Sequence, residues 1–234
     1  MLAARARGST VIGLLALAGL ACLPSTARAA RLTVHIATPS GEPVSQAVVV
    51  ARPTGSVALP GATAEAAMVQ QGQSFNPAVM AVAAGARVSF PNRDRMRHHI
   101  YSFSEAKRFE VRLYSGEEVP TLVFDKPGVI TLGCNIHDWM QGYIFVSASP
   151  WFALTGADGV ATIDSLPDGT YEISLWHPSL GEKPLVREAG LPVTGNRTLN
   201  EVLPALALLD QVPAHDDPLT ARFRHRTAPV RSLP

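Results

Sequence analysis

The sequence predicts an all-β protein, built as sandwiches or as a barrel. The 234 residues include 19 prolines and 18 glycines, and this frequency of turn-forming residues argues against a helical bundle. Short apolar runs with alternating polarity recur between the turns, as expected for half-buried strands. The length is enough for one large domain or two small ones that bury a core without disulfide staples.

The composition excludes two broad classes of protein. Hydrophobic residues make up 47% of the chain, which is too apolar for an intrinsically disordered protein. The 20 Lys and Arg residues are balanced by 19 Asp and Glu residues, and the arginines form no long run. This balance argues against a nucleic-acid-binding protein, whose binding surface is strongly basic.

Residues 1–29 have the pattern of a secretory signal peptide. Arg5 and Arg7 precede a mostly apolar stretch at 11–23, and Ala27-Arg28-Ala29 has the form that places cleavage after Ala29. A membrane anchor is the alternative, but the apolar stretch is shorter than the roughly 20 residues that a spanning helix needs. We therefore expect an exported, periplasmic protein with no membrane span.

The mature chain begins with several strands. Residues 31–36 alternate, with Leu32, Val34 and Ile36 on one face, and 47–51 form an apolar run typical of a buried strand. Residues 52–72 are rich in small side chains, and we expect a loop there with one helical turn at 63–68. The further strands expected in this part are 74–77, 79–82 and 87–90.

More strands are expected up to residue 203. The next set is 99–103, 109–113, 122–124, 129–132 and 143–147. A last set, separated by Asp-Gly turns at 156–159 and 166–169, is 152–154, 161–163, 171–176 and 197–203. Residues 204–234 end in a stretch rich in proline and arginine and are expected to form a mobile tail.

One loop of the chain carries three candidate metal ligands. Cys134, His137 and Met140 have the spacing C-x2-H-x2-M, and they lie between the strands expected at 129–132 and 143–147. Cys22 lies within the signal peptide, so Cys134 is the single cysteine of the mature chain and cannot form an internal disulfide. A thiolate, an imidazole and a thioether are together the donors that suit copper.

A fourth donor is expected from His98-His99, a pair at the start of an upstream strand. Two histidines and a cysteine with a weak axial methionine form a mononuclear blue, or type 1, copper site. Zinc is the alternative, because Cys-x2-His is also a zinc spacing. Zinc has little use for a methionine, and no second cysteine completes a tetrahedral set, so copper is favoured.

The order of these motifs resembles that of plastocyanin-type cupredoxins, and the short Cys134 loop is similar to that of amicyanin. The segments that carry the resemblance are Phe75-Asn76-Pro77, Val82-Ala83-Ala84-Gly85, Val88-Ser89-Phe90-Pro91-Asn92 and His98-His99-Ile100. Amicyanin also has an Asn-Arg-acid-x-Met-x-His stretch, which is matched here by Asn92-Arg93-Asp94-Arg95-Met96-Arg97-His98. The resemblance implies a cupredoxin Greek-key β-sandwich in which one copper is bound by His98, Cys134, His137 and Met140.

The whole chain also resembles exported bacterial methylamine utilization proteins, which pair a cupredoxin with flanking β-sandwich segments. Residues 34–50 and 154–171 are similar to carboxypeptidase-regulatory-like, transthyretin-like modules, which are grouped with carbohydrate-binding-like folds. The resemblance implies a cupredoxin domain at 65–147. It also implies a small transthyretin/Ig-like β-sandwich made from 30–64 and 148–203.

Departures from the cupredoxin pattern give further expectations. Ile136 stands where amicyanin has proline, so its N–H is available to donate to the Cys134 sulfur and to raise the reduction potential. Asn92 and Asn135 are candidates for tying the two ligand loops together. Asp138 places an acid where such proteins show an apolar docking patch, which predicts a redox partner with basic residues around its docking site.

Two functions of different classes follow. The first is a type 1 copper electron-transfer protein that cycles between Cu(I) and Cu(II) and serves a periplasmic amine-oxidising or respiratory chain through a protein redox partner. No substrate bond is made or broken in this role, so the protein is not expected to be an enzyme in its own right. A multicopper oxidase is disfavoured by the single cysteine and by the lack of H-x-H pairs in the sequence. The alternative is a periplasmic copper-holding or sugar- or protein-binding sandwich without redox turnover. Trp176-His177-Pro178 is the one cluster in the flanking segments that combines an aromatic residue with a histidine, as a sugar-binding site could. Its expected role is core packing with a capped histidine.

Overall fold

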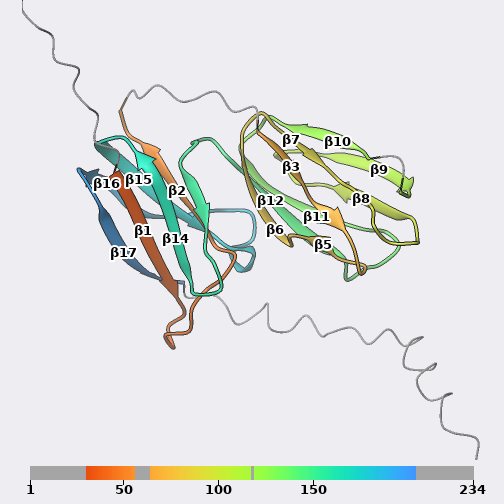
Figure 1. Cartoon of the computed structure of the whole chain (residues 1–234), viewed down its shortest axis with the longest axis horizontal. Coiled ribbons are helices and arrows are strands. Elements are labelled where there is room, and N and C mark those ends of the chain that lie inside the picture. Colours follow the sequence, from red (N-terminus) through yellow and green to blue (C-terminus); the bar gives the residue numbers. More distant parts are fainter. Residues whose placement is uncertain (1–29, 56–63, 117–118, 204–234) are drawn as a thin grey trace, which may run out of the picture.

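The computed structural model describes residues 30–55, 64–116 and 119–203, which fold into two β-sandwiches that lie side by side (Figure 1). Seventeen strands and one short 3-10 turn, Pro178–Leu180, make up the regular structure of these residues, so the predicted all-β class is confirmed. The predicted signal peptide and C-terminal tail lie outside the described residues. No helix within them is long and apolar enough to cross a membrane.

The first sandwich, here called the flanking sandwich, combines the first two strands with the last five. Its strands are β1 (Ala30–Ala37), β2 (Val48–Pro53), β13 (Phe152–Leu154), β14 (Val160–Leu166), β15 (Gly169–Trp176), β16 (Leu185–Val193) and β17 (Arg197–Val202). One sheet has the order β14-β1-β17 and the other has the order β13-β2-β15-β16. In the first sheet β1 is antiparallel to β14 and parallel to β17, so both ends of the described chain share a sheet.

The alternating pattern of β1 explains how the flanking sandwich closes. Leu32, Val34 and Ile36 are buried, whereas the residues between them are partly or fully exposed. Successive side chains of a strand point to opposite faces of the sheet, so these three share the inner face. They pack there in one core cluster with Ile163 of β14 and Ile173 of β15, and this cluster holds the two sheets together.

The second sandwich, here called the site sandwich, contains the middle of the chain. Its strands are β3 (Glu65–Ala67), β4 (Val69–Gln70), β5 (Phe75–Asn76), β6 (Val79–Ala83), β7 (Ala86–Ser89), β8 (His98–Ser102), β9 (Phe109–Tyr114), β10 (Thr121–Phe124), β11 (Gly128–Gly133) and β12 (Gln141–Ser147). A three-stranded sheet has the order β10-β7-β3, a five-stranded sheet has the order β6-β12-β11-β8-β9, and β4 pairs with β5.

The register of the five-stranded sheet brings the candidate ligands together. β11 and β12 form a hairpin whose loop, 134–140, contains Cys134 and the two ligands after it. β11 is also antiparallel to β8, with Gly133 opposite Tyr101. If this antiparallel register is followed past Gly133, the residues of the loop run alongside the first residues of β8, which begins at His98.

The two sandwiches share a third apolar cluster. Val48, Val50 and Trp176 come from the outer face of β2 and β15, and they pack with Val79 and Phe145 of the site sandwich. The Trp176 ring lies 5.6 Å from the ring of Phe145, centroid to centroid. Both faces of β2 are therefore covered, which explains why the sequence at 47–51 is continuously apolar rather than alternating.

The Trp176-His177-Pro178 segment has the structural role expected for it. Trp176 is fully buried, and its indole N–H donates to the carbonyl oxygen of Gly181 at 2.7 Å. His177 is the N-cap of the 3-10 turn, where its Nδ1 accepts from the N–H of Ser179 at 3.3 Å. Burial lowers the pKa of His177, which favours the neutral imidazole that can accept this bond.

Two expectations about secondary structure were wrong. The segment expected to have a helical turn at 63–68 contains β3, which runs parallel to β7 with Glu65 opposite Arg87. β16 was not predicted at all. Seven of its nine positions are partly or fully exposed, so it shows no apolar alternation, and its place is set by backbone pairing with β15. In both cases the sheet decides the conformation and the local side-chain pattern does not.

Replacement of Trp176 by Ala tests the contact between the sandwiches. Loss of a fully buried aromatic side chain should lower the free energy of unfolding by about 3–5 kcal/mol, because the cavity cannot collapse completely. The control is Phe103→Ala, which removes an aromatic ring that is 77% exposed and should cost about 0.5 kcal/mol or less. Urea unfolding measures both, and equal losses would contradict a structural role for this contact.

Candidate metal centre

Three of the four predicted ligands converge on one point at an end of the site sandwich. The ligating atoms of His98, Cys134 and His137 all lie within 4.8 Å of one another. Cys134 Sγ is 3.9 Å from His98 Nδ1, and the two imidazole rings are 5.2 Å apart at an angle of 53°. All three side chains are buried, so a metal held between them would be shielded from water.

Met140, the fourth predicted ligand, lies on the same loop as Cys134 and His137. Its N–H donates to the carbonyl oxygen of His137 at 2.9 Å, which closes a tight turn between the two residues. The Met140 side chain is buried and belongs to the same core cluster as Cys134. The short loop between β11 and β12 thus turns a thiol, an imidazole and a thioether toward the interior.

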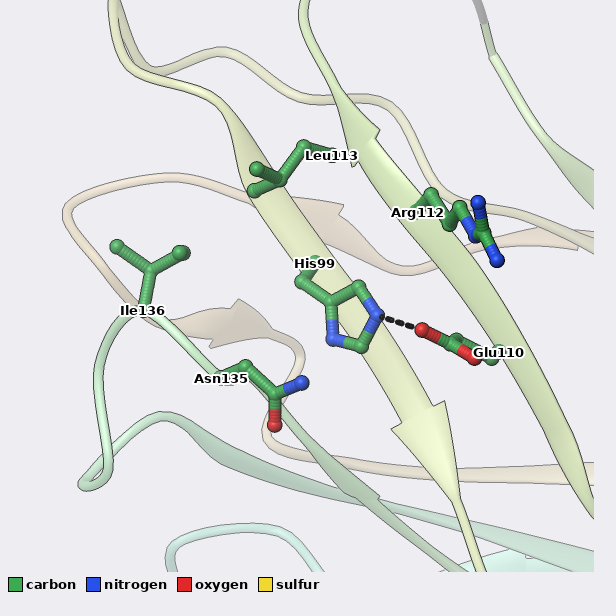
Figure 2. Close-up of a pocket in the computed structure, with 6 residues that line it drawn as sticks. All are labelled: His99, Glu110, Arg112, Leu113, Asn135 and Ile136. Atoms are coloured by element: carbon green, nitrogen blue, oxygen red, sulfur yellow. Dashed lines mark hydrogen bonds and ion pairs between the residues drawn. The ribbon is translucent and has the colours of Figure 1, made fainter.

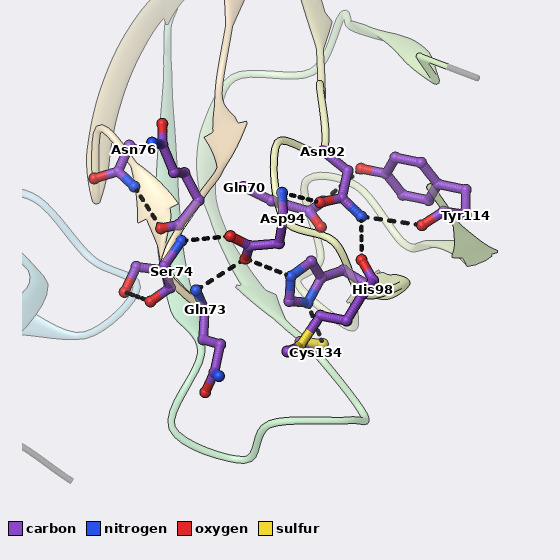
Figure 3. Close-up of polar contacts among 12 residues, drawn as sticks. Gln70, Gln73, Ser74, Asn76, Asn92, Asp94, His98, Tyr114 and Cys134 are labelled. Carbon is purple, nitrogen blue, oxygen red and sulfur yellow. Dashed lines mark hydrogen bonds and ion pairs between the residues drawn. The ribbon is translucent and has the colours of Figure 1, made fainter. Parts of the chain in front are cut away.

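A carboxylate fixes the orientation of His98 (Figure 3). Asp94 Oδ2 lies 2.8 Å from His98 Nε2, on the side of the ring opposite to Cys134. Burial alone would raise the pKa of Asp94, but hydrogen bonds from the N–H groups of Gln73 and Gly72 and from His98 outweigh it and lower the pKa. The ionised carboxylate accepts a hydrogen bond from the N–H at Nε2, which leaves the Nδ1 lone pair of His98 available to bind a metal.

Asn92 organises the loop that leads to His98. Its side-chain amide donates to the carbonyl oxygens of Met96 at 2.9 Å and Tyr114 at 3.1 Å, and its Oδ1 accepts from the N–H of Asp94 at 2.9 Å. The prediction that Asn92 and Asn135 tie the two ligand loops together was wrong. Asn92 instead joins the His98 loop to β9, and Asn135 is exposed.

A buried polar chain under the same loop was not foreseen from the sequence. The Gln70 side-chain amide donates to the hydroxyl of Tyr114, which in turn donates to the carbonyl oxygen of Phe90 at 2.7 Å. The main chain of Gln70 also bonds to Pro91 and Arg93 at 2.8 Å each. Burial raises the pKa of Tyr114, so its hydroxyl stays protonated and able to donate. A Gln, a Tyr and a Pro far apart in sequence give no local signal of such a contact.

His99 faces away from the candidate ligands. Its Nε2 lies 2.9 Å from Glu110 Oε1, and its ring lines a surface hollow of about 390 Å³ together with Asn135 and Ile136 (Figure 2). Neighbouring residues of a strand point to opposite faces, so only one of the two histidines can join Cys134. The structure places His98 there and His99 outside.

The close approach of Tyr101 to Gly133 fixes the end of β11 next to Cys134. An added Cβ at Gly133 would lie 2.5 Å from Cζ of the Tyr101 ring, which is closer than real Cβ atoms come to other groups. Tyr101 also sits in a row of rings on β8, 5.7 Å from His99 and 5.2 Å from Phe103. A side chain at 133 would therefore force the Tyr101 ring to move, one residue before the cysteine.

The donor set fits a mononuclear type 1 copper site. It combines one thiol and two imidazoles in a buried pocket, with a thioether on the same loop. Asp94, the acid nearest to His98, is occupied as a hydrogen-bond acceptor and does not belong to the cluster. One expected feature differs: among the described residues, the N–H of Ile136 makes no hydrogen bond to the Cys134 sulfur.

Several solved structures share part of this fold. The chain is similar to a purple cupredoxin from Nitrosopumilus maritimus, with 23% identity and a TM-score of 0.33 over 35% of this chain and 99% of that one. A reduced amicyanin mutant is 18% identical with a TM-score of 0.34, and the match covers 44% of this chain and 99% of that one. The copper-containing nitrite reductase from Thermus scotoductus SA-01 is 24% identical with a TM-score of 0.34, and the match covers 49% of this chain but only 28% of that one. No protein-family model and no curated protein matches the sequence.

Replacement of Asp94 by Asn tests how His98 is oriented. The amide lacks the charge that holds the proton on His98 Nε2, so copper affinity should fall about 10- to 100-fold. Competition with a chelator measures this affinity. Asp138→Asn is the matched control, because it removes an exposed carboxylate next to His137 and should leave the affinity unchanged. Equal losses in both variants would contradict the role of Asp94.

The Gly133–Tyr101 contact predicts a compensating pair of substitutions. Gly133→Ala should destabilise the protein by about 1–3 kcal/mol, because the methyl group overlaps the Tyr101 ring. Tyr101→Ala in the same chain removes the overlap and should recover most of this loss. Gly55→Ala is the control, since no atom of the described residues lies within 4 Å of a Cβ there. Urea unfolding of Gly133→Ala, of Tyr101→Ala alone and of the double variant gives the coupling energy, and strictly additive losses would refute the contact.

Proposed function

We propose that this chain is an exported type 1 copper electron-transfer protein. The observation that carries the proposal is the convergence of one buried thiol and two buried imidazoles within 4.8 Å, at the end of a β-sandwich. His98, Cys134 and His137 would hold the copper, and Met140 would supply a weak fourth donor. When bound, copper supplies a one-electron couple between Cu(I) and Cu(II).

The protein contributes a rigid and dry site to this function. His98 is fixed by Asp94, Cys134 follows directly on a paired strand, and the turn between His137 and Met140 is closed by a backbone hydrogen bond. Donors held by hydrogen bonds in a buried pocket favour the same geometry in both oxidation states. The change of charge then requires little reorganisation, which is what fast electron transfer needs.

His137 is the proposed point of electron exit. His137 as a residue is 8% exposed, and its ring lies 5.1 Å, centroid to centroid, from the ring of Trp139, a residue that is 36% exposed. Both residues belong to the loop between β11 and β12, so a partner that contacts this loop comes close to a ligand. No bond of a substrate is made or broken in such a transfer, and the protein is proposed to be a carrier rather than an enzyme.

The proposed setting is the periplasm, with a protein redox partner in an amine-oxidising or respiratory chain. The signal-peptide pattern at 1–29 supports export. The flanking sandwich is proposed to support the site sandwich, since the outer faces of β2 and β15 are buried against it by Trp176 and its neighbours.

The proposal is tested by loading the mature chain with Cu(II) and recording visible absorption and EPR spectra. We expect an intense sulfur-to-copper charge-transfer band and a narrow copper hyperfine splitting, because a thiolate lies among the donors. Cys134→Ser should abolish the band. The control Ser102→Ala changes a buried hydroxyl on β8 outside the ligand set and should keep the band. A pale wild-type site with tight Cu(I) binding would instead indicate a copper-holding protein.

A further inference from the structure

Three arginines lie on the loop that leads to His98, one of the candidate ligands. Arg93, Arg95 and Arg97 alternate in the segment that leads to His98, and all three are exposed. Within the described part of the chain, none of their guanidinium groups forms an ion pair. These side chains, here called the arginine loop, therefore present their charges to solvent.

The acid within the arginine loop does not offset these charges at the surface. Asp94 stands between Arg93 and Arg95, but its side chain is only 15% exposed. It is turned inward, where it accepts from two backbone N–H groups and from His98. The arrangement that fixes the metal ligand thus leaves the alternate positions of the loop facing outward as cations.

The neighbouring strand and the Cys134 loop add another cation and apolar side chains at a hollow that His99 also lines. Arg112 of β9 is exposed and lines the same hollow as Leu113 and Ile136. Leu113 is 48% exposed, Ile136 is 50% exposed, and Met96 at the centre of the arginine loop is 42% exposed. Apolar side chains at the ligand loops with cations beside them are the composition of an interaction surface.

Acidic groups in this region are fewer than the arginines. Glu110 lies on β9, and its carboxylate contacts His99 at 2.9 Å. Asp138 is exposed next to His137. Glu182, which lines a hollow with Asp138 and Met140, adds a third carboxylate. Among the described residues of these segments, arginines therefore still outnumber the exposed carboxylates, by four to three. The excess of arginines favours an acidic partner, whereas Asp138 considered alone predicted a partner with basic residues.

We propose that the arginine loop, with Arg112 and the apolar residues between them, is the docking surface for an acidic redox protein. The inference rests on the proposed function, and it names the chemistry of the partner. Carboxylates around the partner's redox centre would be steered to the arginines, and the apolar residues would then make the close contact. Complementary charge of this kind raises association rates by about 10- to 1000-fold at low ionic strength.

The test uses an anionic reagent in place of the partner. One electron passes from the reduced site to the Fe(III) of hexacyanoferrate, which becomes Fe(II), and no bond forms and no proton moves. Stopped-flow oxidation should be fast at low salt and should slow as salt is added. The triple variant R93E/R95E/R97E should lower the low-salt rate about tenfold or more. It should raise the rate with the cationic oxidant tris(phenanthroline)cobalt(III).

A matched control separates a local effect from the change in net charge. The triple variant R87E/K183E/R197E alters three exposed basic residues outside the ligand loops and should change both rates far less. If both triple variants change the rates equally, or neither does, the inference is overturned while the blue band still supports the proposed function. A wild-type protein without the blue band overturns the proposed function itself, and this inference with it.

A binding measurement that does not depend on electron transfer completes the test. Hexacyanochromate(III) is a paramagnetic anion, and it should broaden the amide NMR signals of residues 93–97 in both the metal-free and the Cu(I) protein. Broadening spread evenly over the surface would overturn the inference. So would arginine-dependent cosedimentation with vesicles of equal parts phosphatidylglycerol and phosphatidylcholine, which would assign the loop to a lipid surface instead.

Discussion

The candidate site depends above all on the hydrogen bond between Asp94 and His98. This carboxylate is held by the N–H groups of Gly72 and Gln73, so it connects the turn after β4 with the loop before β8. It thereby decides which nitrogen of His98 carries the proton and which one faces Cys134. The arginines on either side of Asp94 point outward for the same reason, because the residue between them is anchored inside.

The second constraint is the packing around the Cys134 loop. Gly133 brings the end of β11 against Tyr101, and the short turn from His137 to Met140 returns the chain into β12. Ligands from one tight hairpin and one anchored histidine need few further contacts to stay in place. The flanking sandwich packs on the outer face of the five-stranded sheet through Trp176, whose ring contacts Phe145 of that sheet. Its residue Glu182 also lines a hollow beside Met140.

Much of the fold could be predicted because it depends on local patterns. The alternation of Leu32, Val34 and Ile36 gave β1, and the Asp-Gly turns separated the strands at the end of the chain. β16 and β3 could not be predicted in this way. β16 is mostly exposed and β3 is only three residues long, so both owe their conformation to the strand beside them and carry little signal of their own.

By itself the sequence determined which donor types are available, because C-x2-H-x2-M between two apolar strands confines a thiol, an imidazole and a thioether to one short loop. The residues alone left His98 and His99 open and the amicyanin resemblance favoured His98. The tertiary structure places His98 with Cys134 and His137, because adjacent residues of a strand face opposite sides and the register sets which side is inner. It also decided the charge of the surface around the site. That charge depends on Asp94 being mostly buried and its neighbouring arginines being exposed. A net charge counted from the sequence cannot show this, because it gives buried and exposed residues the same weight.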